Sequence, residues 1–333
     1  MELLNTEVLS FLEFNPLRIR EGVLNPKEIE LSQDSTVVIG LGNPEADIKY
    51  ISQELQNLGF KIILPVEIAQ YFFTNNINFE NYWLSGDKLI FDRAEADIKK
   101  AKSLFIEKKS QEIFEKILDY RQNSNLSSLP DLEPLESQYM PSDLPWVQTK
   151  TPISIIDCGA FTGDTIQTFL NKNVIFENYF AFEPDLDNYQ LLLEFVSKNS
   201  ISNIFPLRLA TWSESMMLKF QKSGGNNSGA HLVVESVGKI EKVFALKLDH
   251  MFANEKIGLI KMDIEGAEKD TLIGLEATIK KNKPFLAISA YHKPDDLWKI
   301  PLQIAEASNE YQFFLRVYGQ QTFDTVLYCV PTS

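Results

Sequence analysis

Residues 153–165, which read I-S-I-I-D-C-G-A-F-T-G-D-T, constrain the fold of this chain more than any other stretch. Their β-branched isoleucines lead into an aspartate, which is typical of a buried parallel strand. Two glycines follow, and then Ile166, Phe169 and Leu170 fall at helical spacing. The pattern predicts a strand, a glycine turn and a helix, the repeating unit of an α/β fold with a parallel sheet.

The glycine turn favours one class of ligand over another. Turns that bind dinucleotides carry G-x-G-x-x-G, whereas Asp157, Gly159 and Gly163 form D-x-G-x-x-x-G here. Such a turn offers bare backbone at the positive end of a helix. We interpret it as a site for a zwitterionic amino-acid ligand, whose ammonium group Asp157 would contact. The alternative is an ordinary turn in which the glycines serve geometry alone.

A second acid follows the turn at an informative distance. Residues 179–182 predict a second strand, and Glu183 lies 20 residues beyond Gly163. In doubly wound folds an acid at the carboxyl end of that strand binds a ribose diol. The alternative is an acid at a helix N-terminus, with Pro184 at the first helical position. Because Glu183 comes after this glycine turn, the ribose contact is favoured.

Composition limits the classes of partner. Asp and Glu total 46 and Lys and Arg total 32, which gives a formal net charge of −14 and disfavours nucleic acids and anionic membranes. Cys158 and Cys329 are too few for a disulfide framework or a cysteine metal site. There is no basic leader with an apolar segment, and no apolar run reaches the roughly 18 residues of a membrane span. We expect a soluble, cytoplasmic protein.

The length of 333 residues allows roughly two domains. We expect a small αβ, Rossmann-like domain over residues 1–120 and a second α/β domain over residues 151–333. Between them, residues 121–150 are rich in Pro, Ser and Asn and predict a linker or a lid. In this linker Tyr139 and Met140 are candidates to fold back over a ligand, with plain anchoring to the next domain as the alternative.

The N-terminal half contains another strand, turn and helix pattern. Residues 36–39 and 61–65 predict two parallel strands, with a helix between them. Gly40 and Gly42 suggest a nucleotide-binding turn, but Glu45 stands where the third glycine of the fingerprint would fall. A tight turn in a helper domain is therefore the favoured interpretation.

The remaining strands of the second domain follow from short apolar runs. Residues 216–246 alternate enough for short strands around the loop 223–229. The last two runs predict an antiparallel hairpin at a sheet edge. The expected strands beyond the first two of this domain are 203–209, 257–262, 285–290, 312–318 and 325–330.

Taken together and in order, several motifs resemble the FkbM-type S-adenosylmethionine-dependent methyltransferases over roughly residues 150–331. They are D-C-G-A-F-T-G-D-T, A-F-E-P-D, K-M-D-I-E-G-A-E, A-Y-H and the final L-R-V-Y…T-V-L-Y pair. The resemblance implies a class I methyltransferase sheet of seven strands, order 3-2-1-4-5-7-6, with the last strand antiparallel. It also implies methyl transfer to a hydroxyl of a sugar, glycan or polyketide-like acceptor. Phe161 departs from the many methyltransferases that have a glycine there, and would narrow the cofactor turn.

The turn and the resemblance together give the candidate site. Asp263 and His292 would lie at the carboxyl ends of neighbouring strands, facing the ligand crevice. His292 would act as general base, and Asp263 would orient it, hold the acceptor or share a divalent metal with it. Glu265 is the third catalytic candidate, with helix capping as its alternative. The candidate cofactor-binding residues are Asp157, Gly159, Ala160, Phe161, Gly163, Asp164, Thr165, Glu183, Pro184, Ala210 and Thr211.

Other interpretations stay open at this point. Asp295 and Asp296 could complete a metal site, although P-D-D also predicts the start of a helix. Instead of a methyltransferase, the chain could be a nicotinamide-dependent oxidoreductase acting through Gly40 and Gly42. It could also be a non-catalytic interaction protein that retains the methyltransferase fold. The pattern leaves the acceptor, the oligomeric state and the role of the N-terminal half undefined.

Overall fold

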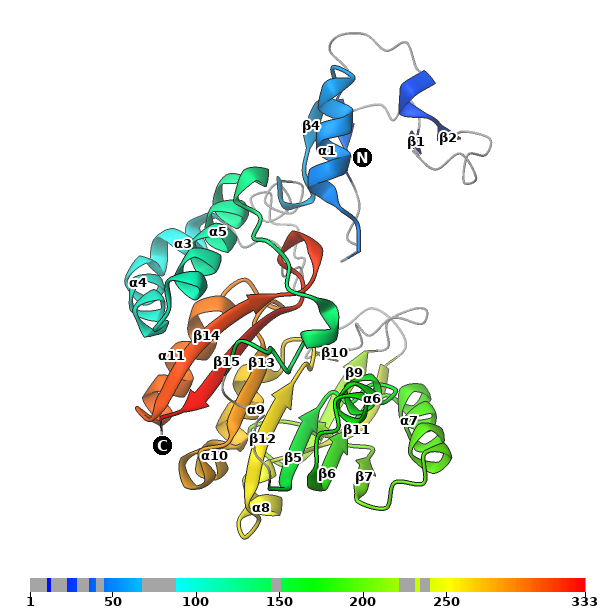
Figure 1. The fold of residues 1–333 in the computed structure, drawn as a ribbon, viewed down its shortest axis with the longest axis vertical. Helices are drawn as coiled ribbons and strands as arrows, with labels where there is room; N and C mark the ends of the chain where they lie inside the picture. The colour runs from blue at the N-terminus through cyan, green and yellow to red at the C-terminus, as the bar shows by residue number, and fades with distance from the viewer. Residues whose placement is uncertain are drawn as a thin grey trace.

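The fold was described from a computed structural model, which covers residues 11–12, 23–28, 36–39, 45–67, 88–144, 151–221, 231–233 and 240–332. The C-terminal half forms a central sheet with helices on both faces (Figure 1). Three helices lie beside one edge of this sheet, and a small αβ unit lies beyond them (Figure 1).

The central sheet has seven strands in the order β14-β15-β13-β12-β5-β6-β7. Strands β13, β12, β5, β6 and β7 are parallel to their neighbours, whereas β15 runs antiparallel to both β13 and β14. Numbered along the chain, the order is 3-2-1-4-5-7-6, which is the order that the resemblance implies. The strand bounds are β5 Ile153–Cys158, β6 Phe176–Phe182, β7 Ile204–Leu207, β12 Ile257–Met262, β13 Phe285–Ser289, β14 Tyr311–Val317 and β15 Thr325–Pro331.

Each face of the central sheet has its own hydrophobic core. In β5, Ile156 and Cys158 belong to one core and Ile155 to the other, as the two-residue period of a strand requires. The first core is closed by α8 to α11 and the second by α6 and α7. Burial on both faces explains why these strands are almost continuously apolar. The helix bounds are α6 Asp164–Asn171, α7 Leu186–Lys198, α8 Leu248–Phe252, α9 Glu268–Gly274, α10 Glu276–Asn282 and α11 Asp296–Ala307.

Three helices that precede the sheet in sequence share its first core. These are α3 Lys88–Arg93, α4 Glu95–Leu104 and α5 Lys108–Asn123. Phe91 and Phe105 are buried in the same cluster as Trp298 of α11. The hydroxyl of Ser110 in α5 accepts a hydrogen bond of 2.9 Å from Leu315 N, so α5 covers the edge strand β14. The expected domain boundary at residue 120 stays a prediction, and this packing favours grouping these helices with the sheet.

The N-terminal αβ unit contains β3 Thr36–Val38, α1 Ile48–Asn57 and β4 Lys61–Ile63, with β3 and β4 parallel. Its core places Ile48 and Leu55 in one cluster with Tyr291 and Phe323 from the sheet side. Two further short strands, β1 Phe11–Leu12 and β2 Val23–Leu24, form a parallel pair. Gly40 and Gly42, on which the nicotinamide interpretation depends, lie outside the described residues.

A second, four-stranded sheet has the order β10-β9-β11-β8. Its bounds are β8 Ala210–Thr211, β9 Met216–Gln221, β10 His231–Val233 and β11 Ile240–Leu246. The expected short strands between 216 and 246 are therefore present, while the loop 223–229 falls outside the described residues. The described helices include none with the length and apolar character to cross a membrane.

Candidate functional site

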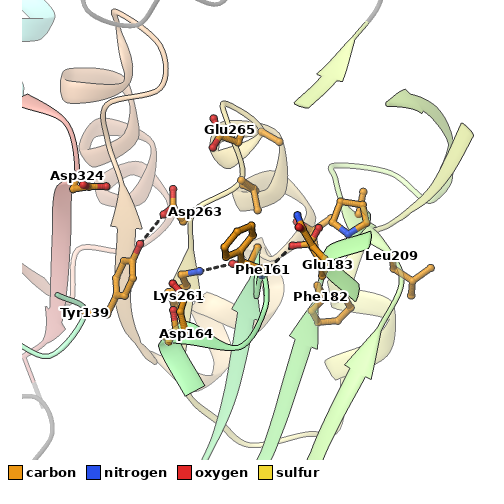
Figure 2. A pocket seen from close by; sticks show the side chains of 18 of the residues that line it. Tyr139, Phe161, Asp164, Phe182, Glu183, Leu209, Lys261, Asp263, Glu265 and Asp324 are labelled. Carbon is orange, nitrogen blue, oxygen red and sulfur yellow. Dashed lines mark hydrogen bonds between the residues drawn. The ribbon is translucent and has the colours of Figure 1, made fainter. Parts of the chain in front are cut away.

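A cavity of about 250 Å³ opens at the carboxyl ends of β5, β6 and β12, where ligands bind in open α/β sheets. We divide its lining into two sides. The turn side contains the residues Gly159, Phe161, Asp164, Thr165, Phe182, Glu183, Pro184, Leu209, Ala210 and Thr211. The strap side contains Gln138, Tyr139, Asp263, Glu265, Tyr291 and Asp324. Figure 2 shows the two sides facing each other, with Lys261 between Tyr139 and Glu183.

The glycines of the turn are required mainly by close packing against the protein interior. Gly159 and Gly163 have φ angles of 82° and 96°, in the left-handed region that favours glycine. A Cβ on Gly159 would lie 1.9 Å from the carbonyl oxygen of Asp263, and one on Gly163 would lie 2.8 Å from the Phe195 ring. The turn therefore packs tightly against β12 and α7. Phe161, with φ of 47°, contributes to the cavity surface between the two glycines.

Glu183 is a buried carboxylate held by backbone amides. It is 6% exposed, follows β6 directly and lines the cavity. Its two oxygens accept hydrogen bonds of 2.9 Å, one from Phe161 N and one from Asp185 N. Burial raises the pKa of Glu183 to about 7. Since each carboxylate oxygen has two lone pairs, both retain capacity to accept a hydrogen bond from a ligand.

Asp157 does not occupy the place that the sequence interpretation gave it. It is fully buried, does not line the cavity, and accepts a hydrogen bond of 2.7 Å from the Tyr179 hydroxyl. Its other oxygen lies 3.0 Å from Lys261 Nζ. Lys261 is its register partner on the neighbouring strand β12, so the two side chains meet on the same face. The positive charge that meets Asp157 is thus supplied by the protein, and the predicted contact with a ligand ammonium is not supported.

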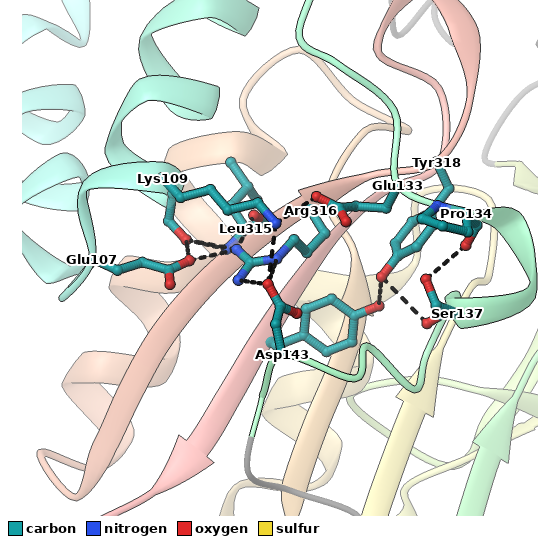
Figure 3. A network of polar contacts seen from close by, with 11 residues as sticks. Glu107, Lys109, Glu133, Pro134, Ser137, Asp143, Leu315, Arg316 and Tyr318 are labelled. Carbon is teal, nitrogen blue, oxygen red and sulfur yellow. Dashed lines mark hydrogen bonds and ion pairs between the residues drawn. The ribbon is translucent and has the colours of Figure 1, made fainter.

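Residues 133–144, which we call the strap, run over the strap side of the cavity and are fastened by ion pairs (Figure 3). Lys109 Nζ lies 2.6 Å from Glu133 and 3.1 Å from Asp143. Arg316, whose side chain is 1% exposed, donates to Asp143 at 2.8 Å. These contacts hold both ends of the strap against α5 and β14. The predicted linker or lid is therefore an ordered part of the site at these residues.

The strap places Tyr139 against the predicted catalytic acid. The Tyr139 hydroxyl donates a hydrogen bond of 2.7 Å to Asp263, as Figure 2 shows. Its backbone N–H donates to the Tyr328 hydroxyl at 3.0 Å. Tyr139 has φ of 63°, a conformation that costs roughly 1–3 kcal/mol in a non-glycine residue and often occurs at functional sites. Of the two linker candidates, Tyr139 lines the cavity and Met140 does not.

His292 lies behind the cavity lining, within a group of carboxylates. Its Nδ1 is 2.8 Å from Glu268, and its Nε2 is 3.2 Å from Asp263 and 3.7 Å from Glu265. Burial alone would lower the pKa of His292, but Glu268 and Glu265 outweigh burial and hold it well above the usual range. Burial would likewise raise the pKa of Asp263, but His292 and Lys261 hold it below its usual range. A charged imidazolium bound to carboxylates is not a free general base, so the role expected of His292 is not supported.

Glu265 differs from its neighbours because its carboxylate lines the cavity and its pKa lies near neutrality. Burial raises the pKa of Glu265 to about 7. The residue has φ of 54° and precedes Gly266, which has φ of 96°. Helix α9 begins at Glu268 with Ala267 as its N-cap and has no side-chain cap hydrogen bond, while the Glu268 side chain accepts a hydrogen bond of 2.9 Å from Ile264 N ahead of the helix. The capping alternative for Glu265 is therefore not supported.

Among the described residues, Asp263, Glu268 and His292 form the group whose ligand atoms lie close enough to hold a metal ion. The 2.8 Å contact of Glu268 with His292 is also that of a buried ion pair, so we derive no step through a metal. Asp295 and Asp296 do not join this group. Both lie within 3 Å of Lys269 Nζ at the start of α11, which agrees with the helix-start alternative.

Most of the predicted site residues come together at the cavity. Asp157, Ala160, Gly163 and His292 lie outside its lining. Those that line it are Gly159, Phe161, Asp164, Thr165, Glu183, Pro184, Ala210, Thr211, Asp263 and Glu265.

Lys261, Tyr291 and Asp324 are among the lining residues that the sequence interpretation missed. Lys261 had a usable signal, because it lies two residues before Asp263 at the end of β12, the spacing of side chains that share one face of a strand. Tyr291 directly precedes His292 at the end of β13. Asp324 had no recognisable sequence signal. It lies in the turn before β15, with φ of 48°, and burial raises its pKa to about 6. The fully buried Arg121 of α5 supports this turn by donating to the Thr322 hydroxyl at 3.1 Å.

Comparison with known proteins identifies a family and a similar crystal structure. Residues 157–320 match the family described as the methyltransferase FkbM domain. The crystal structure of methyltransferase FkbM from Methylobacillus flagellatus superposes with a TM-score of 0.69 at 20% sequence identity. The match covers 85% of this chain and 70% of that one, so the two share a fold that includes more than the FkbM domain.

Other solved methyltransferases are more distant. An rRNA methylase from Streptococcus thermophilus is 14% identical, with a TM-score of 0.36 over 55% of this chain and 88% of that one. Fibrillarin from Aeropyrum pernix, solved with S-adenosyl-L-methionine, is 10% identical, with a TM-score of 0.35 over 59% of this chain and 76% of that one. Likeness at this level is too weak to bear on the fold or the function. No curated protein sequence matches the chain.

Proposed function

Because this chain belongs to the FkbM methyltransferase family through residues 157–320, we propose that it transfers a methyl group from S-adenosylmethionine to a hydroxyl of a small acceptor, such as a sugar or a natural product. The observation that carries this proposal is the cavity at the strand ends, which joins the buried carboxylate of Glu183 to those of Asp263 and Glu265. Glu183 stands on its turn side, and Asp263 and Glu265 stand on its strap side.

The turn side fits the cofactor in the chemistry of its donors and acceptors. Glu183 would accept hydrogen bonds from the ribose diol through the carboxylate lone pairs that its two backbone hydrogen bonds do not use. The apolar side chains of Phe182, Leu209 and Ala210 would line the adenine region. Asp164, at the N-terminus of α6, would meet the ammonium group in place of Asp157. When bound, S-adenosylmethionine supplies an electrophilic methyl group on a positively charged sulfur.

The strap side fits the removal of a proton from an alcohol. The acceptor oxygen forms a bond to the methyl carbon as the bond from that carbon to sulfur breaks, and the hydroxyl proton must leave. Glu265 is our candidate general base, because it lines the cavity and its pKa of about 7 suits proton transfer near neutrality. Asp263 would hold the acceptor hydroxyl with a remaining lone pair of Oδ2, the oxygen that accepts from Tyr139, because Oδ1 is buried against His292. His292 becomes a positioning residue that fixes Asp263 and Glu265.

The charge of the strap side favours a neutral acceptor. Asp263, Glu265 and Asp324 all line it, so a phosphate or carboxylate on the acceptor would be repelled. Carboxylates are suitable acceptors for the hydrogen bonds of a polyol. A neutral sugar, glycan terminus or polyhydroxylated natural product is therefore the class of acceptor that we propose.

The test is a transfer assay with methyl-labelled S-adenosylmethionine and a panel of neutral glycosides, polyhydroxylated natural products and their phosphorylated counterparts. We expect label in at least one neutral compound, none in its phosphorylated counterpart, and loss of transfer in Glu265→Gln. Binding of the cofactor without transfer to any compound would instead support the non-catalytic interaction protein. Label confined to phosphorylated compounds would contradict the acceptor class.

A further inference from the structure

We propose that Lys261 forms a carboxylate-binding site for the amino-acid end of the cofactor, with its ammonium group as the recognition element. This inference rests on the proposed function and adds a residue that the sequence interpretation did not include. It also assigns the two charges of the amino acid to different side chains. Lys261 would meet the carboxylate, and Asp164 the ammonium.

Lys261 is almost completely buried and yet lines the cavity. Its side chain is 3% exposed, and the residue is the next-to-last of β12. Its Nζ donates a hydrogen bond of 2.6 Å to the carbonyl oxygen of Gly159 and lies 3.0 Å from Asp157. An ammonium group has three N–H donors. The contacts with Gly159 and Asp157 therefore leave a donor for a ligand.

The position of Lys261 would suit the amino-acid end of the cofactor. Figure 2 shows Lys261 beside Asp164 and Phe161, on the opposite side of the turn from Glu183 and Leu209. With the ribose at Glu183, the amino-acid chain would extend over the turn toward Lys261. The Tyr139 ring lies 5.2 Å from Nζ and covers this part of the cavity.

The charge pattern around Lys261 supports the same assignment. Lys261 is the basic residue in a lining that has five acidic ones, namely Asp164, Glu183, Asp263, Glu265 and Asp324. A ligand carboxylate would be repelled everywhere in this cavity except beside Lys261.

A structural role alone would explain the contact of Lys261 with Asp157 but not its place at the cavity. The two roles predict different ligand selectivity. If Lys261 only neutralises Asp157, then removing both charges together should leave ligand discrimination unchanged. If it also binds a ligand carboxylate, then discrimination between ligands with and without that carboxylate should disappear.

The experiment is calorimetric titration with S-adenosylhomocysteine and with its decarboxylated analogue, which keeps the amine. We expect the wild-type protein to bind S-adenosylhomocysteine about tenfold or more tightly, the size expected for a charge-assisted hydrogen bond. In the double variant Asp157→Asn with Lys261→Met, which leaves no unpaired buried charge, the two ligands should bind about equally. In the single variant Asp157→Asn, which keeps the lysine, the preference should persist.

Each outcome decides one point. If the wild-type protein binds S-adenosylhomocysteine and its decarboxylated analogue equally well, the proposal is overturned without any variant. It is also overturned if the double variant still prefers S-adenosylhomocysteine. Circular dichroism and thermal melting confirm that the variants are folded, and the wild-type ratio stands even where a variant does not fold. Failure of the wild-type protein to bind either ligand would overturn the proposed function itself, which separates the two claims.

Discussion

The turn side of the cavity is assembled from segments that are close in sequence, whereas the strap side is assembled from segments far apart. Gly159 to Thr211 supply the turn side from three consecutive strand ends. The strap side brings Tyr139 to Asp263, which is 124 residues away, and adds Asp324 from the last turn. A local motif can therefore define the turn side, but only the complete fold defines the strap side.

The two sides also hold their carboxylates differently. Glu183 is fixed by two backbone N–H groups, whose positions depend on the turn and the helix that follows. Asp263 and Glu265 are held by side chains, among them Tyr139 and His292. Backbone contacts change little between related sequences, whereas side-chain contacts can be exchanged. We infer that the turn side sets the cofactor and the strap side sets the acceptor and the chemistry.

The largest effect is expected where the two sides touch each other, at Gly159. Gly159→Ala would place a Cβ 1.9 Å from the Asp263 carbonyl oxygen, so we expect a loss of about 3 kcal/mol or more in the free energy of unfolding. Gly59 is a matched control, because it also has positive φ but nothing lies within 4 Å of its would-be Cβ. Gly59→Ala should cost only about 1 kcal/mol. Equal losses in urea denaturation would contradict the tight contact between the turn and β12.

The next effect separates the chemistry from cofactor binding. Asp263→Asn removes a charge that pairs with His292 and that we propose to hold the acceptor, so we expect the transfer rate to fall about 100-fold or more. Affinity for S-adenosylhomocysteine should change by no more than about threefold, because the substitution lies on the strap side. Steady-state kinetics and titration calorimetry measure the two quantities. A large loss of affinity with little loss of rate would reverse the assignment of the two sides.

A smaller effect tests the strap. Tyr139→Phe removes the hydroxyl that donates to Asp263 and leaves the ring in place, which should lower the transfer rate by about tenfold. The matched control is Tyr318→Phe, since the Tyr318 hydroxyl contacts Tyr328 and lies outside the cavity lining. Similar losses of rate in the two variants would indicate that the strap contributes stability alone.

The smallest effect is a dependence of cofactor affinity on pH. Burial raises the pKa of Glu183 to about 7, so the carboxylate is mostly protonated below that pH and accepts hydrogen bonds from a diol less well. We expect the affinity for S-adenosylhomocysteine to rise between pH 6 and pH 8, by up to about tenfold. Glu183→Gln should flatten this rise. An affinity that falls over the same range would show that a different group controls binding.

The difference between the turn side, built from neighbouring segments, and the strap side, built from distant ones, explains how much could be predicted from the sequence. The strand order and the turn-side residues followed from periodicity and from short motifs, which act over neighbouring residues. The burial of Asp157 could not be predicted, because it depends on which residue of β12 stands in register with it. Tyr139 was identified only as one of two candidates, since no periodic pattern joins the strap to β12. His292 was placed at the correct strand end, but its three acidic neighbours come from the segment that follows the neighbouring strand β12.

The measurement that tests the central claim most directly is calorimetric titration of S-adenosylhomocysteine into the wild-type protein, Glu183→Ala and Glu265→Gln. The account predicts micromolar binding to the wild type, at least about tenfold weaker binding to Glu183→Ala, and nearly unchanged binding to Glu265→Gln. These two residues lie on opposite sides of one cavity, and burial raises the pKa of each to about 7. No binding to the wild type, or equal losses in both variants, would contradict the division of the cavity into a cofactor side and an acceptor side.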